Sequence, residues 1–132
     1  MAVTEVMSVS EYGMNYQKMR VDAATTNIAN ANVVQPKDGA GFKPLMVVKS
    51  DGSDNTIFDP NAFALKAQNI EDKKVYQPEH LAADSQGFVR FANVDLAEQM
   101  ITLTLATRAY EANVKAFNSQ MNMSMKAMEI GK

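Results

Sequence analysis

"LAEQMITLTLATRAYEANVKAFNSQMNMSMKAMEI", residues 96–130, decides the fold of this chain. Its large apolar residues recur every three or four positions, which predicts a helix. Asn93 or Asp95 is the expected N-cap, and Glu98 stands three residues after Asp95, as a capping box requires. A helix from Asn93 to Ile130 would be roughly 55 Å long. Such a length is unusual for a small domain.

Two apolar stripes run along this predicted helix when its residues are placed at about 100° intervals. The first stripe keeps the three-four spacing and consists of Leu96, Met100, Leu103, Tyr110, Val114, Phe117, Met121 and Met128. The second stripe lies nearly opposite and consists of Ile101, Leu105, Ala112, Ala116 and Met123. Charged residues gather between the stripes: Arg108, Glu111, Lys115, Lys126 and Glu129. Because one partner helix cannot cover both stripes, we expect neighbouring copies to bury the second.

The first thirty residues predict another amphipathic helix. Its apolar positions stand seven apart, with alanines beside them: Met7, Met14, Val21 and Ile28, with Ala24 and Ala31. A second face consists of Tyr12, Tyr16, Met19 and Ala23. Gly13 weakens the helix by about 1 kcal/mol, so it marks either a poor helix start or a close contact with another helix. Asn30 and Asn32 suit a helix end, because asparagine tolerates left-handed dihedrals and hydrogen-bonds nearby backbone, and Pro36 prevents continuation.

Between these helices the apolar period becomes two or disappears, which predicts about four short strands. The segments are GFKPLMVVKS (41–50), AFALKAQNI (62–70), KKVYQ (73–77) and GFVRFAN (87–93), with turn clusters at 51–55 and 59–61. The predicted fold is therefore mostly α with a small β insert. It has an N-terminal helix in residues 1–32, a β-rich insert with loops in 33–92 and a C-terminal helix in 93–132. We expect the terminal helices to pair as a coiled coil.

The composition fits one modest domain, because the chain has 132 residues and 46% of them are hydrophobic. The 13 lysines and arginines nearly balance the 15 aspartates and glutamates, which argues against nucleic-acid binding. Cysteine is absent, so disulfides and thiolate metal sites are excluded. No apolar run approaches a membrane span, and the N-terminus lacks the pattern of a signal peptide. We therefore expect a cytosolic protein, or one exported without a cleaved signal.

Signals for catalysis are thin. His80 is the only histidine and lies beside Glu79 and four residues before Asp84, so a metal site or a general base there is one interpretation. A structural or solvated histidine is favoured, because no second histidine or cysteine is present. We expect no enzyme, no metal and no cofactor. Asn113 either fixes the register between the helices through a buried hydrogen bond or lies in solvent.

Two segments resemble signatures of the flagellar axial proteins, the family of rod and hook subunits. "TTNIANAN" (25–32) is similar to the asparagine-rich N-terminal signature, and "TRAYEANVKAFN" (107–118) is similar to the C-terminal one. "DGAGFKPLMVV" (38–48) and "VYQPEHLAADSQGFVRFANVDLAEQM" (75–100) resemble the proximal-rod subunits of the C type. The resemblance covers nearly the whole chain. It departs at Leu81, where relatives have proline. It also departs after the asparagines, where "NVVQPKDGAGF" replaces the usual "NTPGY".

The resemblance implies a structural subunit that is exported unfolded through the flagellar type III apparatus. Such subunits stack helically, by coiled-coil helices, into the hollow rod that transmits torque from the membrane ring to the hook. The implied partners are further copies, other rod proteins, and basal-body proteins on the ring and hook sides; the implied place is the rod in the periplasmic space. By resemblance, the N-terminal packing motif contains Asn27, Ile28, Asn30 and Ala31, and the C-terminal one contains Arg108, Tyr110, Ala112, Asn113 and Val114.

The expected subunit-packing residues combine these motifs with the stripes. They are Met14, Val21, Asn27, Ile28, Asn30, Ala31, Met100, Leu103, Arg108, Tyr110, Asn113, Val114, Phe117 and Met121. Alternative interpretations are another rod or hook subunit, a soluble helical-hairpin adaptor or export chaperone, and a small hydrolase centred on His80. An apolar stripe is also often just intrachain core. If assembly covers the second stripe, the terminal helices should become fully ordered only in the assembly.

Overall fold

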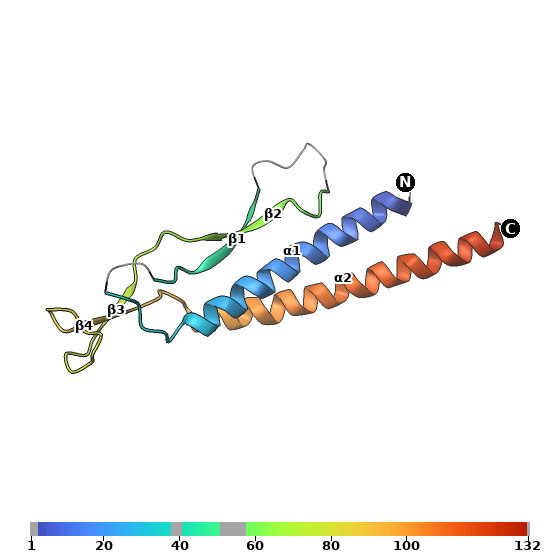
Figure 1. The fold of residues 1–132 in the computed structure, drawn as a ribbon. Coiled ribbons are helices and arrows are strands. Elements are labelled where there is room, and N and C mark those ends of the chain that lie inside the picture. Colours follow the sequence, from blue (N-terminus) through green and yellow to red (C-terminus); the bar gives the residue numbers. More distant parts are fainter. Residues whose placement is uncertain (1–2, 38–40, 51–57, 132) are drawn as a thin grey trace.

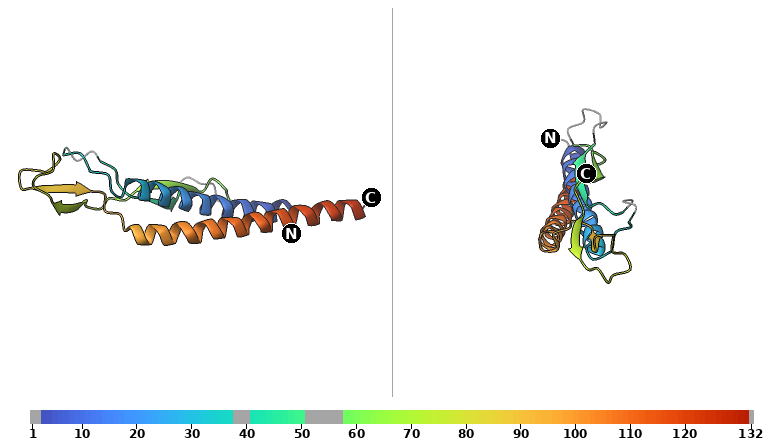
Figure 2. Two further views of the ribbon diagram at one scale, coloured as in Figure 1. Left: turned by 90° about the horizontal axis from the view of Figure 1, so that it is seen from below. Right: turned by 90° about the vertical axis from the view of Figure 1, so that its left-hand side faces the viewer.

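Two long antiparallel helices form the body of the molecule, and they lie side by side with both chain termini at the same end (Figures 1 and 2). The computed structural model describes residues 3–37, 41–50 and 58–131. α1 spans Val3–Asn30 and α2 spans Leu96–Ile130. Four short strands lie between them in the sequence. The predicted fold class, mostly α with a small β insert between paired helices, is confirmed.

α2 begins where a capping residue satisfies its free backbone groups. Asp95 is the N-cap, and its side chain accepts a hydrogen bond from the backbone N–H of Glu98 at 3.2 Å. Of the two predicted caps, Asp95 is therefore the one in use. At the other end Gly131 is the C-cap, and its backbone N–H donates to the carbonyl of Ala127 at 3.1 Å. The result is a helix of 35 residues.

α1 ends at Asn30, as the asparagines predicted, but in a different backbone geometry. The Asn30 side chain donates to the carbonyl of Thr26 at 2.8 Å, which confirms its bonding to nearby backbone. The expected left-handed conformation is wrong, because no non-glycine residue in the described ranges has a positive φ. Instead the chain leaves the helix through i to i+3 bonds, from the N–H of Ala31 to Ile28 and from that of Val33 to Asn30. These right-handed turns satisfy the last carbonyls without a change of φ sign.

The four strands form two separate antiparallel pairs. β1 (Leu45–Lys49) pairs with β2 (Phe63–Ala67), and β3 (Lys73–Tyr76) pairs with β4 (Phe88–Phe91). The predicted number of strands is thus confirmed, and the insert is divided into two hairpins. The 59–61 turn is present between the strands of the first pair. The 51–55 turn cluster lies outside the described residues.

The two hairpins differ in what they contact. The β1–β2 hairpin lies along α1, where the rings of Tyr12 and Tyr16 each lie 4.9 Å from that of Phe63. This hairpin therefore covers the tyrosine face of α1. The β3–β4 hairpin projects beyond the end of the helix pair (Figure 1). We call this projecting part, residues 73–91, the tip lobe.

The buried core consists mostly of small side chains. Its members are Ala23, Ala24, Ala62, Val89, Ala92, Val94 and Ala106. Small residues allow two backbones to approach closely, but they bury little apolar area each. Many large apolar side chains stay exposed, and most of them lie on α2. Among the described helices, none combines the length and apolar character needed to cross a membrane.

Candidate functional site

Asn27 joins three elements and explains why an asparagine stands on the buried face of α1. Its Oδ1 accepts from the backbone N–H of Leu45 at 2.7 Å, and its Nδ2 donates to the carbonyl of Leu45 at 3.0 Å and to Oε1 of Gln99 at 3.1 Å. The side chain is 1% exposed. One amide thereby binds α1 to β1 and to α2. Because buried polar groups need partners, this arrangement also fixes where β1 lies along α1.

The contact between α1 and α2 also includes a glycine and further polar side chains. A Cβ at Gly13 would lie 3.1 Å from Nδ2 of Asn113, so glycine allows the amide to pack against the backbone of α1. Of the two interpretations of Gly13, the structure shows the close contact with another helix. Nearer the termini, the Ser10 hydroxyl donates to Oε1 of Gln120 at 3.0 Å. We call this contact the seam; its polar and small members are Ser10, Gly13, Ala24, Asn27, Gln99, Ala106, Asn113 and Gln120.

The second stripe of α2 is open to solvent. The exposed fractions are 61% for Ile101, 54% for Leu105 and 66% for Met123. Ala112 and Ala116 between them are exposed as well. Neither α1 nor the β hairpins cover this side. The alternative that an apolar stripe is intrachain core is therefore wrong for the second stripe.

The first stripe borders the seam and is only partly covered. Leu103, Val114 and Phe117 are half-buried, whereas Met100 and Tyr110 remain exposed. The other exposed members are Leu96, Met121 and Met128. The helix pair thus presents apolar area on two sides at once. Such contiguous apolar surface is typical of protein interaction sites.

The expected packing residues of α1 lie at intermediate depth. Met14, Val21 and Ile28 are half-buried, and Asn30 and Ala31 follow them at the helix end in the same class. Asn27 differs from them, because it is enclosed within its own chain. Any part that it has in subunit packing would act through the position of β1 and α2. Arg108 is exposed on the charged side of α2.

A polar junction that the sequence did not indicate holds the tip lobe to the body. The Gln35 side chain donates to the carbonyl of Phe42 at 2.6 Å and accepts from its N–H at 2.9 Å. Asp72, whose side chain is mostly buried, lies 3.1 Å from Lys43 Nζ and 3.8 Å from Arg90 Nη1. Asp72 stands far from both Lys43 and Arg90 in the sequence, so only the folded chain brings these three together. In the sequence these residues look like ordinary polar surface residues, so no local pattern predicted their contacts.

His80 lies in the tip lobe and is exposed. Its Nδ1 accepts a hydrogen bond from the N–H of Ala82 at 3.0 Å, which orders the turn that contains it. Within the described ranges, no group of three or more histidine, cysteine or acidic side chains is arranged to hold a metal ion. The imidazole therefore takes part in local turn structure, in line with the favoured interpretation.

Asp84 organises the turn before β4. Its Oδ1 accepts from the backbone N–H groups of Gln86 and Phe88, both at 2.9 Å. The hydrogen bond from Phe88, supported by that from Gln86 and by the charge of Lys74, lowers the pKa of this carboxyl group despite an opposing effect of burial. Gly87 follows with a φ of +87°, a conformation that favours glycine. Residues 85–87 thus form a turn before β4.

A long two-helix body with exposed apolar stripes is typical of proteins that assemble with other chains. Residues 85–130 match the family described as flagellar basal body rod FlgEFG protein C-terminal. This segment contains β4 and all of α2. The class is therefore that of the rod proteins of the bacterial flagellum.

Similar proteins narrow this class. The chain is 31% identical to the flagellar basal-body rod protein FlgC of Aquifex aeolicus, with 89% of each chain covered. It is 29% identical to the protein of the same name from Bacillus subtilis, with 96% of each covered, and to that of Escherichia coli O157:H7, with 99% of each covered. The chain belongs to the FlgC family of flagellar basal-body rod proteins. It is a structural rod protein located in the basal body.

Proposed function

We propose that this rod protein assembles helically through α1 and α2, without catalysis, into a hollow shaft that transmits torque from the membrane ring to the hook. The proposal rests on one observation above all: Ile101, Leu105 and Met123 stay exposed on a helix whose own partner already occupies another side. Burying each such side chain contributes about 1.5–3 kcal/mol. A neighbouring copy with the same two-sided helices supplies the missing apolar contact.

The expected packing residues divide between two kinds of contact in this proposal. Met100, Tyr110 and Met121 are exposed and available to a neighbour, together with Arg108 on the charged side. Half-buried residues extend this surface across both helices: Met14, Val21, Ile28, Asn30, Ala31, Leu103, Asn113, Val114 and Phe117. The seam keeps the two helices in register so that this surface has one shape. The three segments 1–32, 33–92 and 93–132 then act as the two halves of the helical core and an insert.

The proposed partners follow from position in the rod. They are further copies, other rod proteins, and basal-body proteins toward the ring and the hook. In this proposal the subunit passes unfolded through the type III export apparatus and folds afterwards, when α1 and α2 come together from opposite ends of the chain. In a dilute monomer we expect the termini to fray, since the apolar contacts that would hold them are with other copies.

The decisive test introduces charge into the second stripe. A strain that lacks the gene is complemented with the Ile101→Glu, Leu105→Glu double variant, and hooks and filaments are counted by electron microscopy. Both positions are exposed, so the isolated variant should retain wild-type helicity by circular dichroism. The cells should lack hooks and filaments, because the charges prevent apolar contact between copies.

Thr104→Glu is the matched control. Thr104 is exposed on the same turn of α2 but lies outside both stripes. The Thr104→Glu variant adds one charge and should leave flagella normal. Normal flagella in the double variant would contradict assembly through this stripe.

A helical-hairpin adaptor or export chaperone would behave differently. It would be a compact monomer or dimer in dilute solution, with termini that resist limited proteolysis. Rapid loss of both helix ends from the isolated chain, and their protection in purified basal bodies, is the result that the rod proposal expects. A density map of an isolated basal body, with this chain located in it, would distinguish its position from that of another rod or hook subunit.

A further inference from the structure

The last turns of α2 contain an unusual concentration of methionine. Met121, Met123, Met125 and Met128 fall within eight residues, "MNMSMKAM". Methionine normally fills gaps in a core. Here the exposed fractions are 39% for Met121, 59% for Met125 and 71% for Met128, so these side chains do not serve the core of their own chain.

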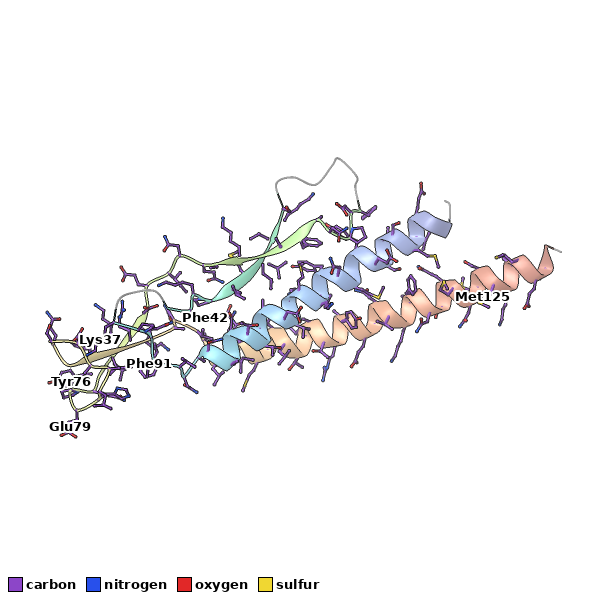
Figure 3. The ribbon with its side chains drawn as sticks, viewed as in Figure 1. Lys37, Phe42, Tyr76, Glu79, Phe91 and Met125 are labelled. Carbon is purple, nitrogen blue, oxygen red and sulfur yellow. The ribbon has the colours of Figure 1, made fainter. Side chains whose placement is uncertain are left out.

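The helix divides these four methionines into two sets. Met121, Met125 and Met128 stand at positions i, i+4 and i+7 and share one face, whereas Met123 points to the opposite side with the second stripe. At 1.5 Å per residue, the outer two of the three are roughly 10 Å apart along the axis, with Met125 between them. Met125 lies near the free end of α2, away from both hairpins (Figure 3). Each side chain has three rotatable bonds, so the three sulfur atoms can turn toward a common point.

The chemistry of three convergent thioethers is narrow. A thioether is neutral and polarisable, so it offers little to Mg²⁺, Ca²⁺ or other hard cations, whereas it suits soft monovalent ions such as Cu(I) and, by the same softness, Ag(I). It also needs no deprotonation before it binds. The chain has no cysteine to compete for such an ion. In the part of the chain that the structure describes, no cluster of histidine and carboxylate side chains favours a borderline metal instead.

We propose that Met121, Met125 and Met128 form a binding site for a soft monovalent cation, Cu(I) or Ag(I), on the free subunit. The site goes beyond the structural role in the rod. Because the first stripe also offers Met121 to a neighbouring copy in the proposed assembly, the ion and the neighbour compete for the same side chains. The site therefore belongs to the subunit before assembly, where the bound ion would hold the otherwise frayed last turns of α2 in the helix.

The test is a titration of the full-length, dilute monomer with Ag(I), which is stable in air, followed by the methyl resonances of its methionines. The resonances of Met121, Met125 and Met128 should shift together and saturate at one ion per chain. Met123 should not move. Met125→Leu should weaken Ag(I) binding at least roughly tenfold. Removing even a residue that only supports a metal ligand, without touching the metal, causes a loss of about that size.

Met123→Leu is the matched control, because it removes an exposed methionine from the same two turns but from the other face. It should bind Ag(I) as the wild type does, and circular dichroism should show both variants to be equally helical. An equal loss of affinity in both variants would overturn the proposal. So would saturation without a joint shift of the three methyl groups, or equal shifts caused by Zn²⁺.

Discussion

Along α2, the side that contacts α1 carries small and polar side chains such as Ala106 and Asn113, whereas the opposite side carries Ile101, Leu105 and Met123. Leu103, Val114 and Phe117 are half-buried and border the same side, so α2 divides its large apolar residues between its own chain and the outside. The seam is held by hydrogen bonds and close approach. The outer side offers apolar area that the chain itself leaves uncovered. Large apolar residues on a helix therefore need not mark the contact with the nearest helix of the same molecule.

The difference also separates two tasks. Hydrogen bonds between specific groups fix one register, because a shifted register would leave buried amides without partners. Apolar contacts contribute more free energy but specify geometry less. The seam thus defines the shape of the subunit, and the outer stripe contributes the free energy of assembly in the proposed rod. Each task is tested by changing side chains on one side only.

The largest effect on the isolated chain should come from Asn27→Ala. The change leaves buried groups of Leu45 and the amide of Gln99 without a partner, and each such group costs about 1–3 kcal/mol. We expect the free energy of unfolding to fall by about 2–4 kcal/mol in a denaturant titration. Asn32→Ala, at an exposed position just past the same helix, should change it by less than about 0.5 kcal/mol. Equal losses in the two variants would mean that Asn27 does not hold the seam.

A double-mutant cycle at Gly13 and Asn113 should give a smaller effect. Gly13→Ala alone should be nearly neutral, because its gain in helix propensity of about 1 kcal/mol is offset by the displaced Asn113 amide. With Asn113→Ala in the background, the added methyl group has room, and the gain should appear in full. Thermal unfolding of the four variants measures the coupling. Simple additivity would show that the two residues do not meet in solution.

The outer stripe should hardly affect the isolated chain. Leu105→Gln exchanges one exposed side chain for another, so the free energy of unfolding of the dilute monomer should change by less than about 0.5 kcal/mol. The same variant should impair assembly, which sedimentation of purified subunits under polymerising conditions would measure. A loss of monomer stability above about 1.5 kcal/mol, the lower bound for burial of a large apolar side chain, would show that the stripe is covered within the chain.

Acidification should have the smallest overall effect, and it should change the tip lobe without changing the seam. The folded-state pKa of Asp84 is lowered, so its contribution is present above the unfolded pKa and is lost as the pH falls through the folded pKa. The amide resonances of Gln86 and Phe88 should then shift. Those around Asn27 and Ser10 should not, because amide and hydroxyl groups do not titrate. Asp84→Asn should abolish the pH response, and loosening of the seam at the same pH would contradict this distinction.

Much of the architecture could be predicted because it depends on local patterns. The spacing of apolar residues indicated both helices, and period-two segments between turn residues indicated the four strands. Asp95 as N-cap and the close contact at Gly13 follow from the chemistry of single residues. The backbone at Asn30 was wrongly predicted, because asparagine permits a left-handed conformation without requiring one, and the following turn chose otherwise.

The packing residues were harder to predict, since two apolar stripes on one helix do not say which side meets α1. Asn27 had a detectable signal: it stands three and four residues after Ala24 and Ala23, on an apolar face. Its partners had none, because Leu45 and Gln99 are remote in the sequence. The contact of Asp72 with Lys43 was missed for the same reason, whereas Gln35 and Phe42 are only seven residues apart but lie in a loop without a periodic pattern.

The sequence by itself determined the two long helices, the four strands between them and an excess of apolar perimeter on α2, because helix and strand periods are set by neighbours along the chain. Only the tertiary structure decided that the excess faces outward and that amides and alanines form the seam. That choice depends on which groups from distant segments can satisfy one another at close range. A buried amide such as Asn27 has few acceptable surroundings, whereas a leucine on a helix packs against many.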